Sequence, residues 1–83
     1  MNIPYFRPEI GEEEQQAVLQ ALASGWLTSG RVVREFESEF AAFVGAKHAV
    51  AVNSCTAALH LAYEAAGVGP GDLVLVPTLT FSA

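Results

Sequence analysis

Two short apolar segments, 49–52 (AVAV) and 73–76 (LVLV), constrain most strongly what this chain can fold into. A strand with no polar residue in it is typical of a sheet that is covered on both faces. An alanine-rich segment, 57–66, separates the two and ends at Gly67. Strand, helix and strand within about thirty residues predict a βαβ unit, whose two strands run parallel.

Two helices are expected before this unit. The first begins near Gly11 and ends at Gly25, and its first turn, 12–14, holds three glutamates whose negative charge suits that end of the helix dipole. The second ends at Gly45 and has the clearest helical period in the chain. Apolar residues recur there at intervals of three and four, which predicts that they pack in a core: Val33, Phe36, Phe40, Phe43 and Val44.

The composition indicates a folded α/β protein of which this chain is a part. Hydrophobic residues make up 52% of the 83 residues and charged residues 16%, which excludes a disordered tail. So much apolar side chain predicts a partner surface outside this sequence, and a two-stranded parallel sheet would leave both edges bare. We therefore expect a truncated α/β fold, in which 1–46 form an extended segment and two helices and 47–83 hold the βαβ unit.

The charge and the single cysteine exclude several classes of protein. The chain has nine acidic and four basic residues, a net charge of −5, and lacks the basic stripe that a nucleic-acid-binding protein needs. No apolar stretch approaches the roughly 20 residues that span a bilayer, and no signal peptide is visible. Because Cys55 is the only cysteine, no intrachain disulfide can form, as suits a reducing compartment. We expect a cytoplasmic protein that binds neither nucleic acid nor membrane.

Ligands of open α/β sheets bind beyond the carboxyl ends of the strands. The turn 53–56 follows the first expected strand and opens a helix, so its free N–H groups and the hydroxyls of Ser54 and Thr56 favour an anion such as phosphate. Plain capping of the helix by these hydroxyls is the alternative. Phe81 follows the second expected strand, where its ring could stack on a planar cofactor or simply pack.

Two further residues, Trp26 and Cys55, have both a functional and a plain structural interpretation. Trp26, in the glycine-bounded loop 25–30, could line a pocket or hold the loop to a neighbour. Cys55 could be a nucleophile, but His60 lies about 140° around the helix axis, so no catalytic pair is expected. Lys47, the only lysine, precedes the first expected strand and is expected on the surface. Neither histidines nor carboxylates show metal-ligand spacing, so no metal site is predicted.

Short motifs recur in order along nearly the whole chain: 3–4 (IP), 7–8 (RP), 25–30 (GWLTSG), 36–37 (FE), 44–50 (VGAKHAV), 53–61 (NSCTAALHL), 69–72 (GPGD) and 76–81 (VPTLTF). At these spacings the chain resembles the DegT/DnrJ/StrS-type sugar aminotransferases, which depend on pyridoxal phosphate (PLP). The resemblance implies a type I aminotransferase fold, in which 47–83 start the PLP-binding large domain, and a homodimer. It also implies transfer of an amino group, from a donor such as glutamate, to a keto-sugar nucleotide for surface polysaccharides or antibiotics.

The resemblance assigns cofactor binding to one turn and one aromatic ring: Ser54, Cys55, Thr56, Ala57 and Phe81. Thr56 and the Ala57 amide match the groups that bind the PLP phosphate, and Phe81 matches a ring that stacks on PLP. Trp26 and Thr28 match a loop near the substrate pocket. The family's Schiff-base lysine has no counterpart here, so the 83 residues alone are expected to be inactive and to contain no catalytic residue. A PLP-dependent sugar dehydratase and a non-catalytic phosphate-binding βαβ module are the alternatives.

Overall fold

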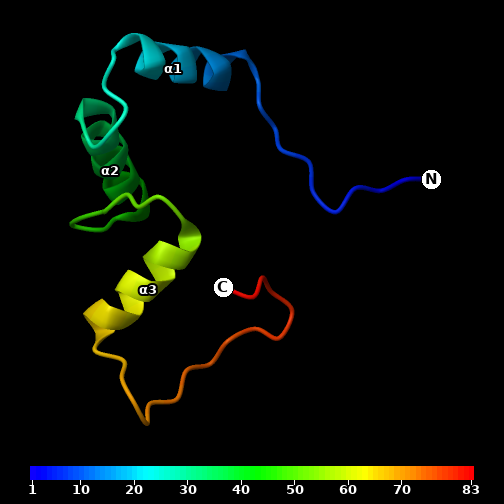
Figure 1. Ribbon diagram of the computed structural model, residues 1–83, viewed down its shortest axis with the longest axis vertical. Helices are drawn as coiled ribbons and strands as arrows, with labels where there is room; N and C mark the ends of the chain where they lie inside the picture. Colours follow the sequence, from blue (N-terminus) through cyan, green and yellow to red (C-terminus); the bar gives the residue numbers. More distant parts are fainter. The chain divides into compact units, whose positions relative to one another are not determined.

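The computed structural model describes residues Met1–Ala83 and contains three α-helices (Figure 1). These are α1 (Glu12–Ala23), α2 (Arg31–Val44) and α3 (Cys55–Ala66). The chain divides into two units, Met1–Ala49 with α1 and α2, and Val50–Ala83 with α3. The three helices predicted from the sequence are confirmed. None of them is long and apolar enough to cross a membrane.

The start of α1 is fixed by one of its own glutamates. Gly11 is the N-cap residue, and its N–H donates a hydrogen bond of 2.7 Å to Oε2 of Glu14. This is the half of a capping box that needs no side chain at the cap position. Hydrogen bonds from the backbone N–H groups of Glu14 itself and of Gly11 hold the pKa of the Glu14 carboxyl below its usual value. The predicted acidic first turn therefore fixes the residue at which α1 begins, and its charge also interacts favourably with the helix dipole.

Glycines end α2 and α3 in the same way. Gly45 and Gly67 both have φ of 72°, in the left-handed region that side chains with a Cβ avoid. The next N–H after each glycine turns back onto the helix, from Ala46 to the Ala41 carbonyl at 2.9 Å and from Val68 to the Tyr63 carbonyl at 3.0 Å. The predicted glycine stops are thereby confirmed, because this turn closes both helices.

The two predicted strands do not form in this structure. No residue of 49–52 or 73–76 is paired in a β-ladder, so the βαβ unit is not seen. Parallel strands are stable in sheets of several strands covered on both faces, and these two segments are the only candidates in the chain. Leu73 and Leu75 are almost fully exposed, so the face of the second segment that carries them is uncovered. The α/β prediction is thus confirmed for the helices, and its sheet stays a prediction.

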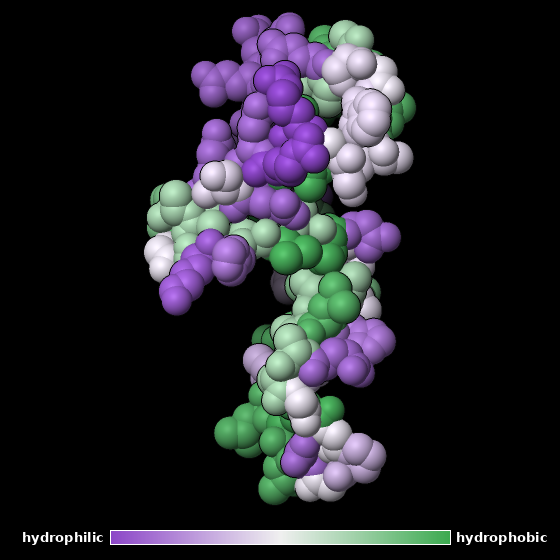
Figure 2. Space-filling model, turned by 90° about the vertical axis from the view of Figure 1, so that its left-hand side faces the viewer, coloured by the Kyte–Doolittle hydropathy of each residue, from purple (hydrophilic) through white to green (hydrophobic).

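The apolar stripe of α2 is formed but is not covered. The rings of Phe36 and Phe40 contact each other with centroids 5.8 Å apart, yet about half of each side chain is exposed, and Phe43 is 90% exposed. Ala41 is the only buried hydrophobic residue in the chain. Figure 2 shows hydrophobic residues open to solvent on the face that it draws. The predicted period is confirmed, whereas the predicted packed core is absent because the chain supplies no surface opposite this stripe.

Candidate functional site

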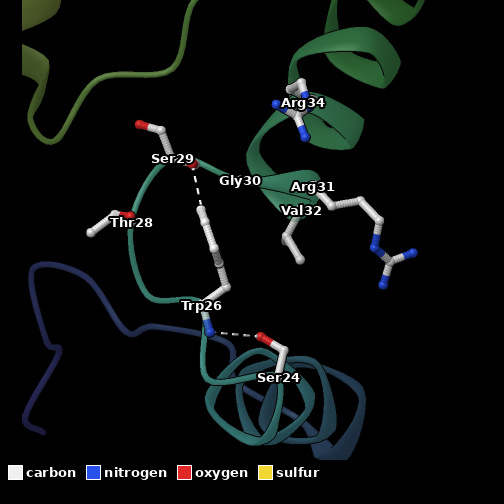
Figure 3. A pocket seen from close by; sticks show the side chains of 8 residues that line it. All are labelled: Ser24, Trp26, Thr28, Ser29, Gly30, Arg31, Val32 and Arg34. Carbon is white, nitrogen blue, oxygen red and sulfur yellow. Dashed lines mark hydrogen bonds between the residues drawn. The ribbon is translucent and has the colours of Figure 1, made fainter.

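A cavity of about 340 Å³ lies where the α1–α2 loop joins the start of α2 (Figure 3). All its lining residues come from one stretch of the chain: Ser24, Trp26, Thr28, Ser29, Gly30, Arg31, Val32 and Arg34. Trp26 and Thr28, the two residues predicted to contact a substrate, are therefore in the same cavity. Their contact with a substrate stays a prediction.

Trp26 is fixed at two points. Its backbone N–H donates to the Ser24 hydroxyl at 3.2 Å, and its indole Nε1–H donates to the Ser29 carbonyl at 3.0 Å; both bonds are dashed in Figure 3. The Ser24 hydroxyl in turn donates to the Ala21 carbonyl in the last turn of α1 at 2.6 Å. The indole N–H is thus used within the loop. A molecule in the cavity would meet the apolar ring and not its polar edge.

The indole ring lies directly against Gly30, which is buried. A Cβ atom on Gly30 would lie 2.2 Å from Cδ1 and 2.4 Å from Nε1 of Trp26, whereas carbon atoms in good contact are about 3.5–4.0 Å apart. Gly30 is the N-cap of α2 and has φ of −151°, an extended conformation open to any residue. Glycine is therefore required here by the indole and not by the backbone.

The charge of the cavity is opposite to that of the chain. Two of the four basic residues, Arg31 and Arg34, line the cavity, and none of the nine acidic residues does. Arg31 forms an ion pair with Glu35, with Nη1 and Oε1 3.1 Å apart. Both side chains are largely exposed, so this pair contributes little to stability. Arg34 forms no ion pair with an acidic side chain in the structure.

Trp26 and Thr28 were predicted only through the family resemblance, and most residues of this cavity were not predicted from the sequence. The missed residues are Ser24, Ser29, Gly30, Arg31, Val32 and Arg34. One signal was available: two arginines three positions apart lie on one side of a helix start in an otherwise acidic chain.

The turn predicted to bind phosphate lies at the start of α3. Ser54 is the N-cap residue, and its hydroxyl oxygen accepts a hydrogen bond of 3.1 Å from the Ala57 N–H. The Ala57 amide, predicted as a phosphate donor, is therefore occupied by Ser54 in this structure. The N–H groups of Cys55 and Thr56 have no acceptor, and the Thr56 hydroxyl makes no hydrogen bond. Capping and anion binding are thus compatible, because the cap uses one donor and leaves three free.

Phe81 is not fixed against this turn. Its side chain is 82% exposed and makes no ring contact or hydrogen bond. The structure therefore leaves its predicted stacking on PLP as a prediction. Cys55 is exposed, and Nε2 of His60 lies 3.8 Å from Oε1 of Glu64 in the next turn of the helix. No group of three or more His, Cys, Asp or Glu side chains in the chain is placed to hold a metal ion.

Comparison with known proteins gives a match over most of the chain. The model of the DegT/DnrJ/EryC1/StrS aminotransferase family matches residues 8–83. A curated protein of Bacillus subtilis (strain 168), "Spore coat polysaccharide biosynthesis protein SpsC", is 64% identical over 81 residues, which are 98% of this chain and 21% of that protein. The chain thus spans about a fifth of the length of this curated relative. No solved structure matches the chain.

Proposed function

Since the chain belongs to the DegT/DnrJ/EryC1/StrS aminotransferase family, as its motifs predicted, we propose that it is the amino-terminal part of a PLP-dependent aminotransferase acting on a keto-sugar nucleotide. The family match over residues 8–83 carries the proposal. The name of the 64% identical relative mentions spore coat polysaccharide biosynthesis. We therefore propose an amino sugar for a surface polysaccharide as the product. A glutamate-like donor, a homodimer and a cytoplasmic location belong to the same proposal.

The start of α3 is proposed to hold the phosphate of PLP. Its free donors, the N–H groups of Cys55 and Thr56 and the Thr56 hydroxyl, are of the kind that bind a phosphate at a helix start. Ser54 fixes the turn by capping the helix, and the Ala57 amide can join the phosphate only if Ser54 releases it. When bound, PLP supplies the electron sink for amino transfer, and these residues supply its position.

The two predicted strands are proposed to form a sheet in a longer polypeptide. There, 49–52 and 73–76 would be neighbouring parallel strands of the large domain that starts at residue 47, with further strands on their edges. The turn 53–56 and Phe81 would then lie at the carboxyl edge of one sheet, where ligands of such folds bind. Trp26 and Thr28 are proposed to contact the sugar substrate from their cavity.

The proposal is tested on the complete polypeptide that carries this sequence. We expect it to contain PLP after purification and to form 2-oxoglutarate from glutamate when a keto-sugar nucleotide is added. Thr56→Ala removes a hydroxyl that would bind a charged phosphate, a bond worth about 1.5–3 kcal/mol, and should weaken PLP binding at least tenfold. Ser38→Ala, which removes an exposed hydroxyl on α2, is the matched control and should bind PLP normally. A complete polypeptide that neither contains nor binds PLP would refute the proposal.

The 83 residues alone are proposed to be inactive, since no residue in them corresponds to the family's Schiff-base lysine. The same amino-transfer assay on this chain should show no product above background. Product formation that depends on this chain would contradict the assignment of catalysis to residues outside it.

A further inference from the structure

We propose that the cavity beside Trp26 binds the phosphate groups of the nucleotide-linked substrate, with Arg34 as the residue that selects an anion. The identity of the substrate rests on the proposed function. The binding of an anion rests on the cavity alone.

The cavity is complete within a single short stretch of chain. Its lining residues all fall within 24–34, inside the unit Met1–Ala49, so its form does not depend on any other part of the molecule. Its volume of about 340 Å³ lies within the range of roughly 300–1,000 Å³ that is common for ligand pockets. The stretch therefore provides a pocket large enough for a diphosphate group.

The charges in the cavity select the sign of the ligand. A cation would find no carboxylate in the lining, whereas an anion would find the guanidinium of Arg34, which has no acidic partner. The planar guanidinium can donate two parallel hydrogen bonds to a phosphate, a geometry that lysine lacks. Arg31 lines the same cavity, but Glu35 already holds one end of its guanidinium. Arg34 is therefore the residue on which binding should depend.

The indole wall of the cavity is already in place before a ligand arrives. The hydrogen bonds of Trp26 to Ser24 and Ser29 hold the indole on Gly30 without any ligand. The hydroxyls of Thr28 and Ser29 make no hydrogen bonds and are available as further donors. A pocket that needs little ordering on binding loses less of its interaction energy to entropy.

The test uses Trp26 as its reporter, because it is the only tryptophan of the chain. Inorganic pyrophosphate is titrated into the chain at constant ionic strength while the Trp26 fluorescence and the indole N–H signal in NMR spectra are followed. We expect a saturable change that Arg34→Gln weakens about tenfold, as for loss of a charge-assisted hydrogen bond. Arg34→Lys keeps the charge without the fork and should lie between the two. Arg7→Gln removes the same charge outside the cavity and should leave binding unchanged.

Each other outcome contradicts the proposal. An unsaturable response, or equal weakening by Arg7→Gln and Arg34→Gln, would mean unspecific attraction of the anion. Glutamate is titrated in parallel, and an Arg34-dependent response to glutamate instead of pyrophosphate would assign the cavity to a carboxylate. If circular dichroism shows that Arg34→Gln loses helix, Arg34→Lys decides the result. PLP binding is measured separately at the start of α3, so failure of the proposed function and failure of this inference give different results.

Discussion

Replacing Gly30 with alanine should release the Trp26 indole from the wall of the cavity. The new Cβ would lie 2.2 Å from Cδ1 of the ring, more than 1 Å short of a normal carbon contact. The backbone can accept alanine, because φ of Gly30 is −151°. The only way to relieve the overlap is therefore to move the ring, and this breaks the 3.0 Å hydrogen bond from Nε1 to the Ser29 carbonyl.

The cost of this movement can be bounded from the structure. The Trp26 side chain is 65% exposed, so the ring can swing into water instead of being compressed. The variant loses the indole hydrogen bond, worth about 0.5–1.5 kcal/mol net. It also replaces glycine at the N-cap of α2 by alanine, which is a worse cap by about 1 kcal/mol. The loss of the hydrogen bond, about 1 kcal/mol, would lower the ratio of closed to open loop by a factor of roughly 5, and the weaker cap would lower the stability of α2.

Quenching of Trp26 fluorescence by acrylamide and hydrogen exchange at the indole N–H measure this ratio directly, since the chain has one tryptophan. Both should rise strongly in Gly30→Ala. The matched control is Gly69→Ala, where a Cβ would meet no atom within 4 Å and φ is not in the left-handed region. If Gly30→Ala keeps the quenching and indole exchange of the unaltered chain, the contact between indole and glycine does not hold the loop.

Three further results are expected. Ser54→Ala removes the cap of α3 and should destabilise this helix by about 1 kcal/mol, seen as faster amide exchange at Ala57; unchanged exchange would contradict the cap. The pKa of Glu14 is lowered, so its hydrogen bond with the Gly11 N–H stabilises α1 to the full extent when the pH is above the ordinary glutamate pKa. This stabilisation is lost as the pH falls through the lowered pKa. The Gly11 amide shift should report this loss, Glu14→Gln should abolish it, and persistence of the shift change in that variant would exclude the assignment. Finally, heating this chain should show no cooperative transition, because Ala41 is its only buried hydrophobic residue. A sharp calorimetric peak would contradict this prediction and favour an independent module.

The helices could be predicted because the signals that set them are local. Gly45 and Gly67 stop their helices through a turn of a few residues, and Glu14 reaches its cap within one turn. The apolar period of α2 is likewise a property of consecutive residues. None of these features needs the rest of a protein, so sequence and structure agree on them.

The sheet and the cavity depend on contacts that a linear pattern does not contain. A strand such as 73–76 needs neighbours to pair with, and a hydrophobic run does not say whether they are present. The contact of Trp26 with Gly30 depends on the path of the loop between them. The sequence of the loop, GWLTSG, does not by itself reveal that path. The turn 53–56 was predictable in part. Capping by Ser54 was one of the two interpretations of the sequence, whereas the donors that the cap leaves free are visible only in the structure.

The exposed segment 73–76 also affects how readily this chain aggregates in solution. Four consecutive β-forming residues with unpaired edges are a template for strand exchange between copies and so for aggregation. The two residues that flank the segment limit this tendency. Asp72, whose carboxylate accepts a hydrogen bond of 2.7 Å from the Gly69 N–H, places a negative charge before it. Pro77, which follows it, has no backbone N–H to donate to another strand. Aggregation of the isolated chain will therefore depend on its concentration. Asp72 and Pro77 raise the concentration at which fibres or a precipitate appear.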